Sequence, residues 1–447
     1  MGNDDVKGTV GRLMEHLFPI AAAMGLLVSP EGLIILGNAA GRAGRGLFYV
    51  LMGAGLLHMT TATAYQRIYA QYPGPIGEIR LIGKAWSLLP ALCVSAFARL
   101  IAAVFASTAL LATAGYVFNE VFLYWFPNLG FSFCLLGLLL ILNLSGMRGA
   151  ATGQVLFIGL ALGGLLFLSV AGLLEWGSPP APMPDGPTPM ADFPRTALAC
   201  LLLLIGFDLA AYAVVEEGNP ARAMMVAVLL AGLTFSIWGW VSAAYVPAER
   251  LSGTSIPHVR AARAVLGETG RIWMGMIALA GTCAAVNALL MATARMMAMM
   301  ADEGLLPPFL AKGKDETTVG VLVLAAAVAA MLGSGMAGEP ILEVYMKAGL
   351  CFWLLHYSLI LAAVFKTSVQ ALPGSPAQSG MGYRFLLFAG WAAMALAFCG
   401  MFVLDPEWKL LLRTVVLLFA IALLFGAFWV SFSRKKGWLK PFEQALG

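Results

Sequence analysis

Four ionisable residues stand inside long apolar stretches of this 447-residue sequence: Glu31, Arg99, Asp208 and Lys347. A charge inside a bilayer is costly. Such residues therefore usually face a protein interior, pair with one another, and mark the path of a solute or a proton. Two acids and two bases could balance each other, so we expect internal ion pairs among these four residues.

Both acids lie where an apolar run is interrupted. Glu31 belongs to S-P-E-G, in the middle of the run 24–36, and Asp208 follows G-F in the run 196–216. Interrupted membrane segments at corresponding positions of two halves are the best sequence indication of a transporter binding site. We therefore predict a substrate site formed by Ser29, Pro30, Glu31, Gly32, Gly206, Phe207 and Asp208.

The roles of the charged residues stay open at this level. Glu31 could bind a substrate ammonium group, carry a coupling proton, or pair with Arg99. Arg99 could be a structural partner of Glu31 or Asp208, or a fork for an anionic group of the substrate. Lys347 lies near one end of its apolar stretch, where its long side chain could reach the membrane interface or stand in for a cation.

The composition defines the class of protein. Hydrophobic residues make up 60% of the chain and charged residues 11%, with a mean hydropathy of +0.86, whereas globular domains carry about 25% charged residues. The chain is therefore an all-α polytopic membrane protein. Its net charge is +4, and the basic residues form no cluster other than residues 434–436. Nucleic acid is therefore not an expected partner. Six cysteines and four histidines lack metal-ligand spacing, so we expect no metal and no cofactor.

Twelve segments are long and apolar enough to be read as spans, because a span needs about 20 apolar residues. Lysine and arginine are more frequent in the connectors on one side, which predicts cytoplasmic termini in a bacterial inner membrane. The expected spans are 17–40, 46–70, 88–117, 131–146, 152–174, 196–216, 224–246, 271–300, 319–337, 341–365, 385–404 and 409–432.

Two connectors on the opposite side have distinct patterns. Residues 178–190 are rich in proline, which indicates an irregular loop. Residues 248–269 contain a candidate amphipathic helix after Pro257, either a plain surface helix or a lid over an outer vestibule. The glycine-rich stretch 37–46 lacks the strand and the G-K-[ST] of a phosphate loop, so we interpret it as close helix packing followed by a turn.

Four stretches together resemble the amino acid–polyamine–organocation (APC) permeases. GFDLAAYAVVEEGNPARA (206–223) is similar to that family's sixth-span signature, and VNALLMATARMMAMMADEGLLPPF (286–309) to the end of its eighth span. AYQRIYAQYPGPIGE (64–78) and NLSGMRGAATGQ (143–154) are weaker matches. The resemblance implies a LeuT-type fold of 12 transmembrane helices, with a 5+5 inverted repeat followed by two C-terminal helices.

This resemblance implies a domain plan and a function. The plan is a cytoplasmic N-terminus (1–16), a first repeat (17–176), an outer loop (177–194), a second repeat (195–366), two further spans (367–433) and a basic tail (434–447). The implied function is secondary transport of an amino acid or small organic amine by alternating access, either proton-coupled or by exchange. A transport-inactive sensor and an intramembrane enzyme are the alternatives, although the chain shows no H-E-x-x-H or G-x-S-x-G motif.

One departure from the family concerns the first interruption. The family usually has G-[AST]-G there, whose backbone N–H groups hold the substrate carboxylate. This chain has Pro30-Glu31-Gly32 instead. Proline removes one donor, and the negative charge of Glu31 disfavours a second carboxylate nearby. We therefore expect a cationic group, a proton or an internal arginine at this position.

Overall fold

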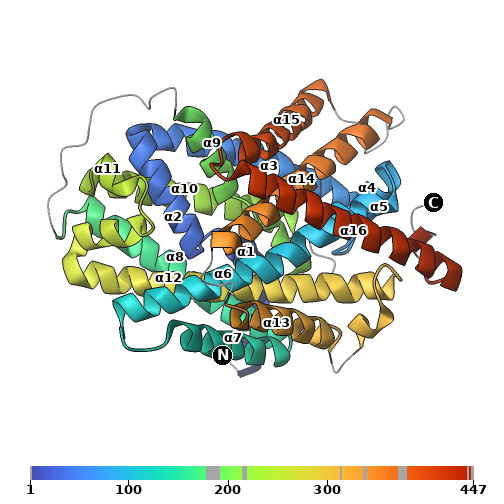
Figure 1. Ribbon diagram of the computed structural model, residues 1–447, viewed down its shortest axis with the longest axis horizontal. Helices are drawn as coiled ribbons and strands as arrows, with labels where there is room; N and C mark the ends of the chain where they lie inside the picture. The colour runs from blue at the N-terminus through green and yellow to red at the C-terminus, as the bar shows by residue number, and fades with distance from the viewer. Residues whose placement is uncertain are drawn as a thin grey trace.

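The computed structural model describes residues 3–177, 192–213, 219–312, 315–335, 340–370, 380–439 and 442–443. Most of the predicted proline-rich loop and part of the basic tail lie outside these residues. The described chain is a bundle of helices in which α1 (Asn3–Met24) and α6 (Phe97–Val121) occupy the centre (Figure 1). The C-terminal helix α16 (Trp408–Lys436) runs diagonally across the face turned to the viewer.

The remaining elements follow in chain order. They are α2 (Pro30–Ala43), η1 (Gly44–Gly46), α3 (Leu47–Gln71), α4 (Gly77–Ala85), α5 (Leu88–Pro90), η2 (Ala91–Ala96), α7 (Asn128–Leu144), α8 (Met147–Leu173), α9 (Phe193–Leu203), η3 (Phe207–Tyr212), α10 (Ala221–Tyr245), α11 (Ala248–Leu251), α12 (Pro257–Asp302), η4 (Pro308–Ala311), α13 (Thr318–Gly333), α14 (Pro340–Gln370) and α15 (Met381–Val403).

Nine helical stretches within the described residues are long and apolar enough to cross a bilayer, with Pro30–Gln71 taken as one stretch. Two further apolar helices, α7 and α13, are shorter, and they pack together along the lower edge of the bundle in Figure 1. The protein is therefore an integral, multi-pass membrane protein. The count of twelve spans and the inverted repeat remain predictions.

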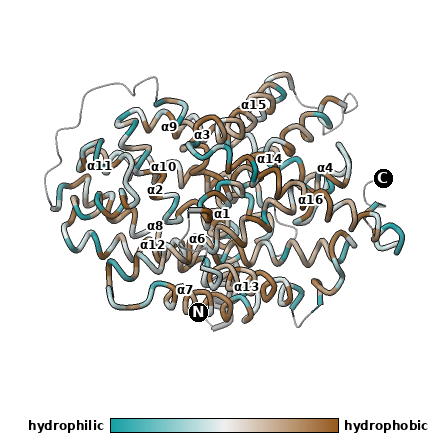
Figure 2. The backbone as a smooth tube through the Cα atoms, viewed as in Figure 1, coloured by the Kyte–Doolittle hydropathy of each residue, from teal (hydrophilic) through white to brown (hydrophobic). Residues whose placement is uncertain are grey.

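Apolar residues cover the outside of the bundle as well as its interior (Figure 2). Helix α16 shows this most clearly, because large side chains such as Val416, Leu424 and Phe428 are more than half exposed. In a soluble protein this surface would be an association site, whereas a membrane protein presents it to lipid tails. Buried polar side chains, in contrast, gather in the interior, where they form the contacts described below.

The first interruption is a helix start. Helix α1 ends at Met24, and α2 begins at Pro30 with Ser29 as its N-cap. The Ser29 hydroxyl accepts a hydrogen bond from the Gly32 amide at 3.2 Å. Serine at the cap, proline at the first helical position and an acid in the first turn are the residue types that begin a helix most readily. The S-P-E-G stretch is therefore the start of α2, and the interruption lies between the end of α1 and this new helix.

The second interruption depends on one glycine. Helix α9 ends at Leu203, and the short helix η3 begins at Phe207. Between them Gly206 has a φ of +106°, a conformation that L side chains rarely adopt. A neighbouring helix satisfies the amide that this conformation frees, since Gly206 N donates to the Tyr357 hydroxyl at 3.2 Å.

The connector 248–269 packs against α2. Asn38 accepts a hydrogen bond from the Gly253 amide at 2.7 Å, and a side chain at Gly37 or Gly41 would collide with this connector. The expected helix after Pro257 is present and continues through a kink at Leu266 and Gly267 into the rest of α12. The glycine-rich stretch 37–46 is therefore a packing surface and a turn, as interpreted from its sequence.

Candidate functional site

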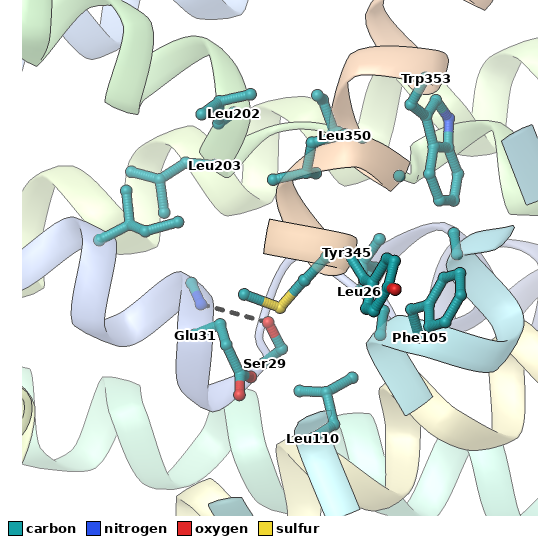
Figure 3. A pocket seen from close by; sticks show the side chains of 17 residues that line it. Leu26, Ser29, Glu31, Phe105, Leu110, Leu202, Leu203, Tyr345, Leu350 and Trp353 are labelled. Carbon is teal, nitrogen blue, oxygen red and sulfur yellow. Dashed lines mark hydrogen bonds between the residues drawn. The ribbon is translucent and has the colours of Figure 1, made fainter. Parts of the chain in front are cut away.

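A small cavity lies beside the two interruptions. Its volume is about 70 Å³, and it opens next to the first turn of α2. Figure 3 shows Glu31 on one side of it and Phe105 and Trp353 on the other. The lining is otherwise mostly aliphatic and includes Leu26, Ile35, Leu110, Leu202, Leu203, Ile205 and Leu350. A ligand of this cavity would be largely apolar, with one position for a charged or polar group.

A larger cavity of about 980 Å³ adjoins the small one, since Glu31, Ile35, Leu202, Met346 and Leu350 line both. We call this larger cavity the vestibule. It opens at the ends of helices that the sequence predicts to be on the outer face. Its charged lining residues are Glu31, Arg42, Arg195, Glu343, Lys347 and Asp405. A solute could therefore reach Glu31 through the vestibule.

Only one of the two carboxylate oxygens of Glu31 has a hydrogen-bond partner among the described residues. The Thr113 hydroxyl donates to its Oε1 at 3.0 Å. Its Oε2 is buried, and no described residue forms a hydrogen bond with it. A buried acceptor without a partner is unfavourable, and such atoms often indicate a missing ligand, ion or water. Glu31 is therefore placed to receive a donor from a solute in the cavity.

The backbone around Glu31 offers little to an anion. Pro30 has no N–H, the Gly32 amide is bonded to Ser29, and the Leu33 amide donates to the Ser29 carbonyl at 3.0 Å. Across the cavity, α9 ends at Leu203, and Leu202 and Leu203 line the wall. The C-terminal end of a helix carries partial negative charge. The end of α9 therefore adds partial negative charge to the cavity wall, whereas the start of α2 adds partial positive charge beside Glu31.

Arg99 lies in a separate, sealed cluster. Its guanidinium is fully buried and forms ion pairs with Glu78 Oε1 at 2.6 Å and Asp208 Oδ2 at 2.5 Å. Neither acid is more than 1% exposed. A further bond joins Arg99 Nη1 to the Ser95 carbonyl at 3.3 Å. An isolated charge in this interior would be costly in free energy, and the ion pairs and hydrogen bonds offset that cost.

Aromatic side chains complete this cluster. The Trp353 indole N–H and the Tyr357 hydroxyl both donate to Asp208 Oδ1, at 2.9 and 2.6 Å. The hydroxyls of Tyr65 and Tyr212 donate to the two oxygens of Glu78, at 2.5 and 2.8 Å. We call Glu78, Arg99, Asp208, His356 and these four aromatic residues the buried cluster.

The buried cluster closes the side of the small cavity away from the vestibule. Helix α4, which carries Glu78, also carries Arg80, and Arg80 pairs with Glu303 at 2.5 Å. Glu303 directly follows the last residue of α12, while Ser255, two residues before its first residue, lines the vestibule. Trp353 belongs to both regions, because it lines the small cavity and bonds to Asp208.

The predicted site residues divide between these two regions. Ser29, Glu31 and Gly32 line the small cavity. Pro30, Gly206, Phe207 and Asp208 are not among its lining residues. The reason for the last two is the direction of η3: Asp208 faces Arg99, and the Phe207 ring stacks on Tyr357 with centroids 5.2 Å apart.

The observed ion pairs also differ from those considered in the sequence analysis. Arg99 contacts Asp208 but not Glu31, whose bonding partner is Thr113. A Glu31–Arg99 pair is therefore wrong for this structure, because α6 presents Thr113 to Glu31 and directs Arg99 toward α4 and η3. Lys347 joins Glu343 and Asp405, both at 2.7 Å, at the wall of the vestibule. It contacts neither Glu31 nor the buried cluster.

Sequence reasoning missed Glu78, Thr113 and Trp353 as site residues. Glu78 ends the family-like stretch 64–78, and that position was its one available signal. Thr113 and Trp353 are uncharged residues in apolar spans and carry no distinguishing pattern. His58 and His356 are buried and hydrogen-bonded, His58 to the Leu201 carbonyl and His356 to the Ser95 hydroxyl.

Two interrupted helices beside a cavity at the centre of a helical bundle define a LeuT-type transporter. The family model described as amino acid permease matches residues 19–435, so the chain belongs to that family and is a secondary transporter. No curated protein matches the chain. The APC resemblance and the fold class predicted from sequence are confirmed.

Solved structures agree on the fold. The crystal structure of MhsT in complex with L-phenylalanine covers 86% of this chain and 98% of its own, with a TM-score of 0.58 and 14% identity. An Eremococcus coleocola manganese transporter, in complex with an aromatic bis-isothiourea substituted compound, covers 100% of this chain and 96% of its own, with a TM-score of 0.54 and 14% identity. At this identity the likeness shows the fold alone.

Proposed function

We propose that this transporter carries a small solute with a cationic amine and an apolar remainder, and that Glu31 binds the amine. The observation that carries this proposal is that Glu31 lines both cavities, while its Oε2 atom is buried and has no partner among the described residues. A charge-assisted hydrogen bond from an ammonium group would satisfy it.

The rest of the cavity supports an apolar remainder. Phe105 and Tyr345 stack with ring centroids 4.7 Å apart and line the same cavity as Trp353. Aromatic faces bury large areas and attract cations at close range. An alkyl or aromatic group would fill this wall, while the amine lies across the cavity at Glu31.

A substrate carboxylate finds less support at this position. Pro30 has no amide N–H, the Gly32 and Leu33 amides are already bonded, and Glu31 would repel a second negative charge. Amines should therefore bind more tightly than the matching α-amino acids. An amino acid remains the second candidate, because Arg42 and Arg195 line the vestibule and could receive its carboxylate.

The transport cycle follows from the two regions. The vestibule gives access from one face, and the buried cluster blocks the other. We propose alternating access in which the buried cluster opens after the solute binds. We also propose a bacterial inner membrane location with cytoplasmic termini, as the lysine and arginine distribution predicts, and no enzymatic activity.

The test is uptake into proteoliposomes that contain the purified protein. The panel compares phenethylamine and isoamylamine with L-phenylalanine and L-leucine, which are the same solutes with a carboxylate added. We expect saturable uptake of the amines with at least tenfold lower KM. Preference for the amino acids would contradict the amine proposal, and no uptake of any panel member would contradict the proposed substrate class.

A further inference from the structure

The buried cluster has an unbalanced charge. Glu78 and Asp208 contribute two negative charges, and Arg99 contributes one positive charge. All three side chains are 0 to 1% exposed. A net negative charge in an interior without water is unfavourable, so the cluster favours one additional positive charge.

The carboxylates themselves are poor positions for a proton. Each of their four oxygens already accepts at least one hydrogen bond from an arginine, tyrosine or tryptophan donor. A protonated carboxyl group would have to donate, and Arg99 and Trp353, which face these carboxylates, can only donate. The added charge therefore belongs on a group that can still accept.

His356 is such a group. Its Nδ1 lies 2.9 Å from the Ser95 hydroxyl, and its Nε2 lies 3.2 Å from Arg99 Nη2 and 3.4 Å from Glu78 Oε2. A neutral ring with its proton on Nδ1 can donate to Ser95 and accept from Arg99 through Nε2. Histidine is also the side chain that ordinarily changes charge between pH 5 and 8.

We propose that His356 Nε2 is a proton-binding site and that this proton is the co-substrate of transport. The coupling part of this inference rests on the proposed function, whereas the proton site itself does not. Proton binding makes Nε2 a donor, so it exchanges Arg99 for Glu78 as its partner. The cluster then carries one positive charge for each negative charge.

The groups that face His356 come from every neighbouring element. They are Tyr65 from α3, Glu78 from α4, Ser95 and Arg99 from the η2–α6 segment, and Tyr357 from its own helix. Asp208 and Tyr212 from η3 bond to Arg99 and Glu78 in turn. His58 lies edge-on to Tyr357 and bonds to the Leu201 carbonyl instead. It is therefore a matched control, a buried histidine outside the charge network.

A series of contacts connects His356 to the substrate cavity. Arg99 released from His356 still binds Asp208 Oδ2, and Asp208 holds Trp353 and Tyr357 through Oδ1. Trp353 lines the cavity, and Tyr357 accepts from the Gly206 amide at the second interruption. Ser95 belongs to η2, a π-helical turn, and such turns are frequent at functional sites. A proton on His356 thus acts on the buried cluster, which must open during transport.

A direct test uses NMR of the whole protein in detergent with labelled histidine. The chain has only four histidines: His16, His58, His258 and His356. The His356 signal should change with pH as Nε2 takes up a proton. Glu78→Gln should move its midpoint to lower pH, because the attracting carboxylate is lost. Tyr65→Phe should move it to higher pH, because Glu78 Oε2 becomes free for His356. A signal that does not titrate, or that ignores both substitutions, overturns the proton site.

A second test measures coupling with phenethylamine as the probe and a pH-sensitive dye inside proteoliposomes. Wild-type uptake should move protons with the amine. His356→Gln should reduce proton movement at least tenfold while phenethylamine affinity stays within threefold, and His58→Gln should change neither. Full proton movement in His356→Gln overturns the proposal. If the wild type does not bind phenethylamine, the substrate proposal fails, and the NMR titration still decides the proton site.

Discussion

The two helix interruptions contain the same residue types, an acid beside or near a glycine, yet the two acids have opposite surroundings. Asp208 is fully buried, and both of its oxygens accept hydrogen bonds. Glu31 lines two cavities and leaves one oxygen without a partner among the described residues. Asp208 is satisfied within the protein, and we propose that Glu31 binds the solute.

This difference explains how one transporter can both bind and close. A site that must release its ligand needs a group that is unsatisfied without the ligand, as Glu31 is. A closed barrier needs charges that satisfy one another, as Arg99 and its two acids do. Trp353 joins the two regions, so occupation of the cavity can change the stability of the barrier.

The largest effect should follow the loss of Arg99. Arg99→Gln leaves two buried carboxylates without their cation, which should destabilise the protein by about 3–5 kcal/mol. Thermal unfolding of the purified protein in detergent measures this. Lys347→Gln is the control, because its pairs lie at the partly exposed vestibule wall and should be worth about 1 kcal/mol or less. Equal losses in the two variants would contradict the barrier.

Double substitutions separate the two acids further. Asp208→Asn should recover part of the loss in Arg99→Gln, because the two residues are in contact. Glu31→Gln should recover none of it, since no contact joins it to Arg99. Rescue by Glu31→Gln instead would show that the pairing is different from the one described.

A smaller effect should follow Trp353→Phe. The substitution keeps an aromatic ring at the cavity but removes the N–H that bonds to Asp208. A hydrogen bond to a charged group is worth about 1.5–3 kcal/mol, so uptake should fall by about tenfold or more. Ligand affinity should change less than the transport rate. An equal loss of both would indicate that Trp353 acts through the cavity alone.

The smallest effect should follow Thr113→Val, which removes the single hydrogen bond to Glu31 Oε1. One such bond contributes about 1 kcal/mol, so ligand affinity should fall by about fivefold. The dissociation constant from equilibrium binding measures this. An unchanged affinity would mean that Thr113 does not help to position the carboxylate.

The sequence predicted the membrane class, the approximate helices and both interruptions, because apolar length and residues such as proline and glycine act locally. It did not predict which acid is free. That depends on the rotation of α6, which turns Arg99 toward Asp208 and Thr113 toward Glu31. Glu78 was missed because a connector with its own short helix folds back into the interior, and composition alone does not indicate such burial.

The central claim is that Glu31 binds the solute without supporting the fold. The most direct measurement is the thermal unfolding of Glu31→Gln with and without phenethylamine, next to the wild type and the vestibule control Glu343→Gln. We predict that Glu31→Gln unfolds within a few degrees of the wild type and loses the stabilisation by phenethylamine, while Glu343→Gln keeps it. Stabilisation of Glu31→Gln equal to that of the wild type would contradict this account.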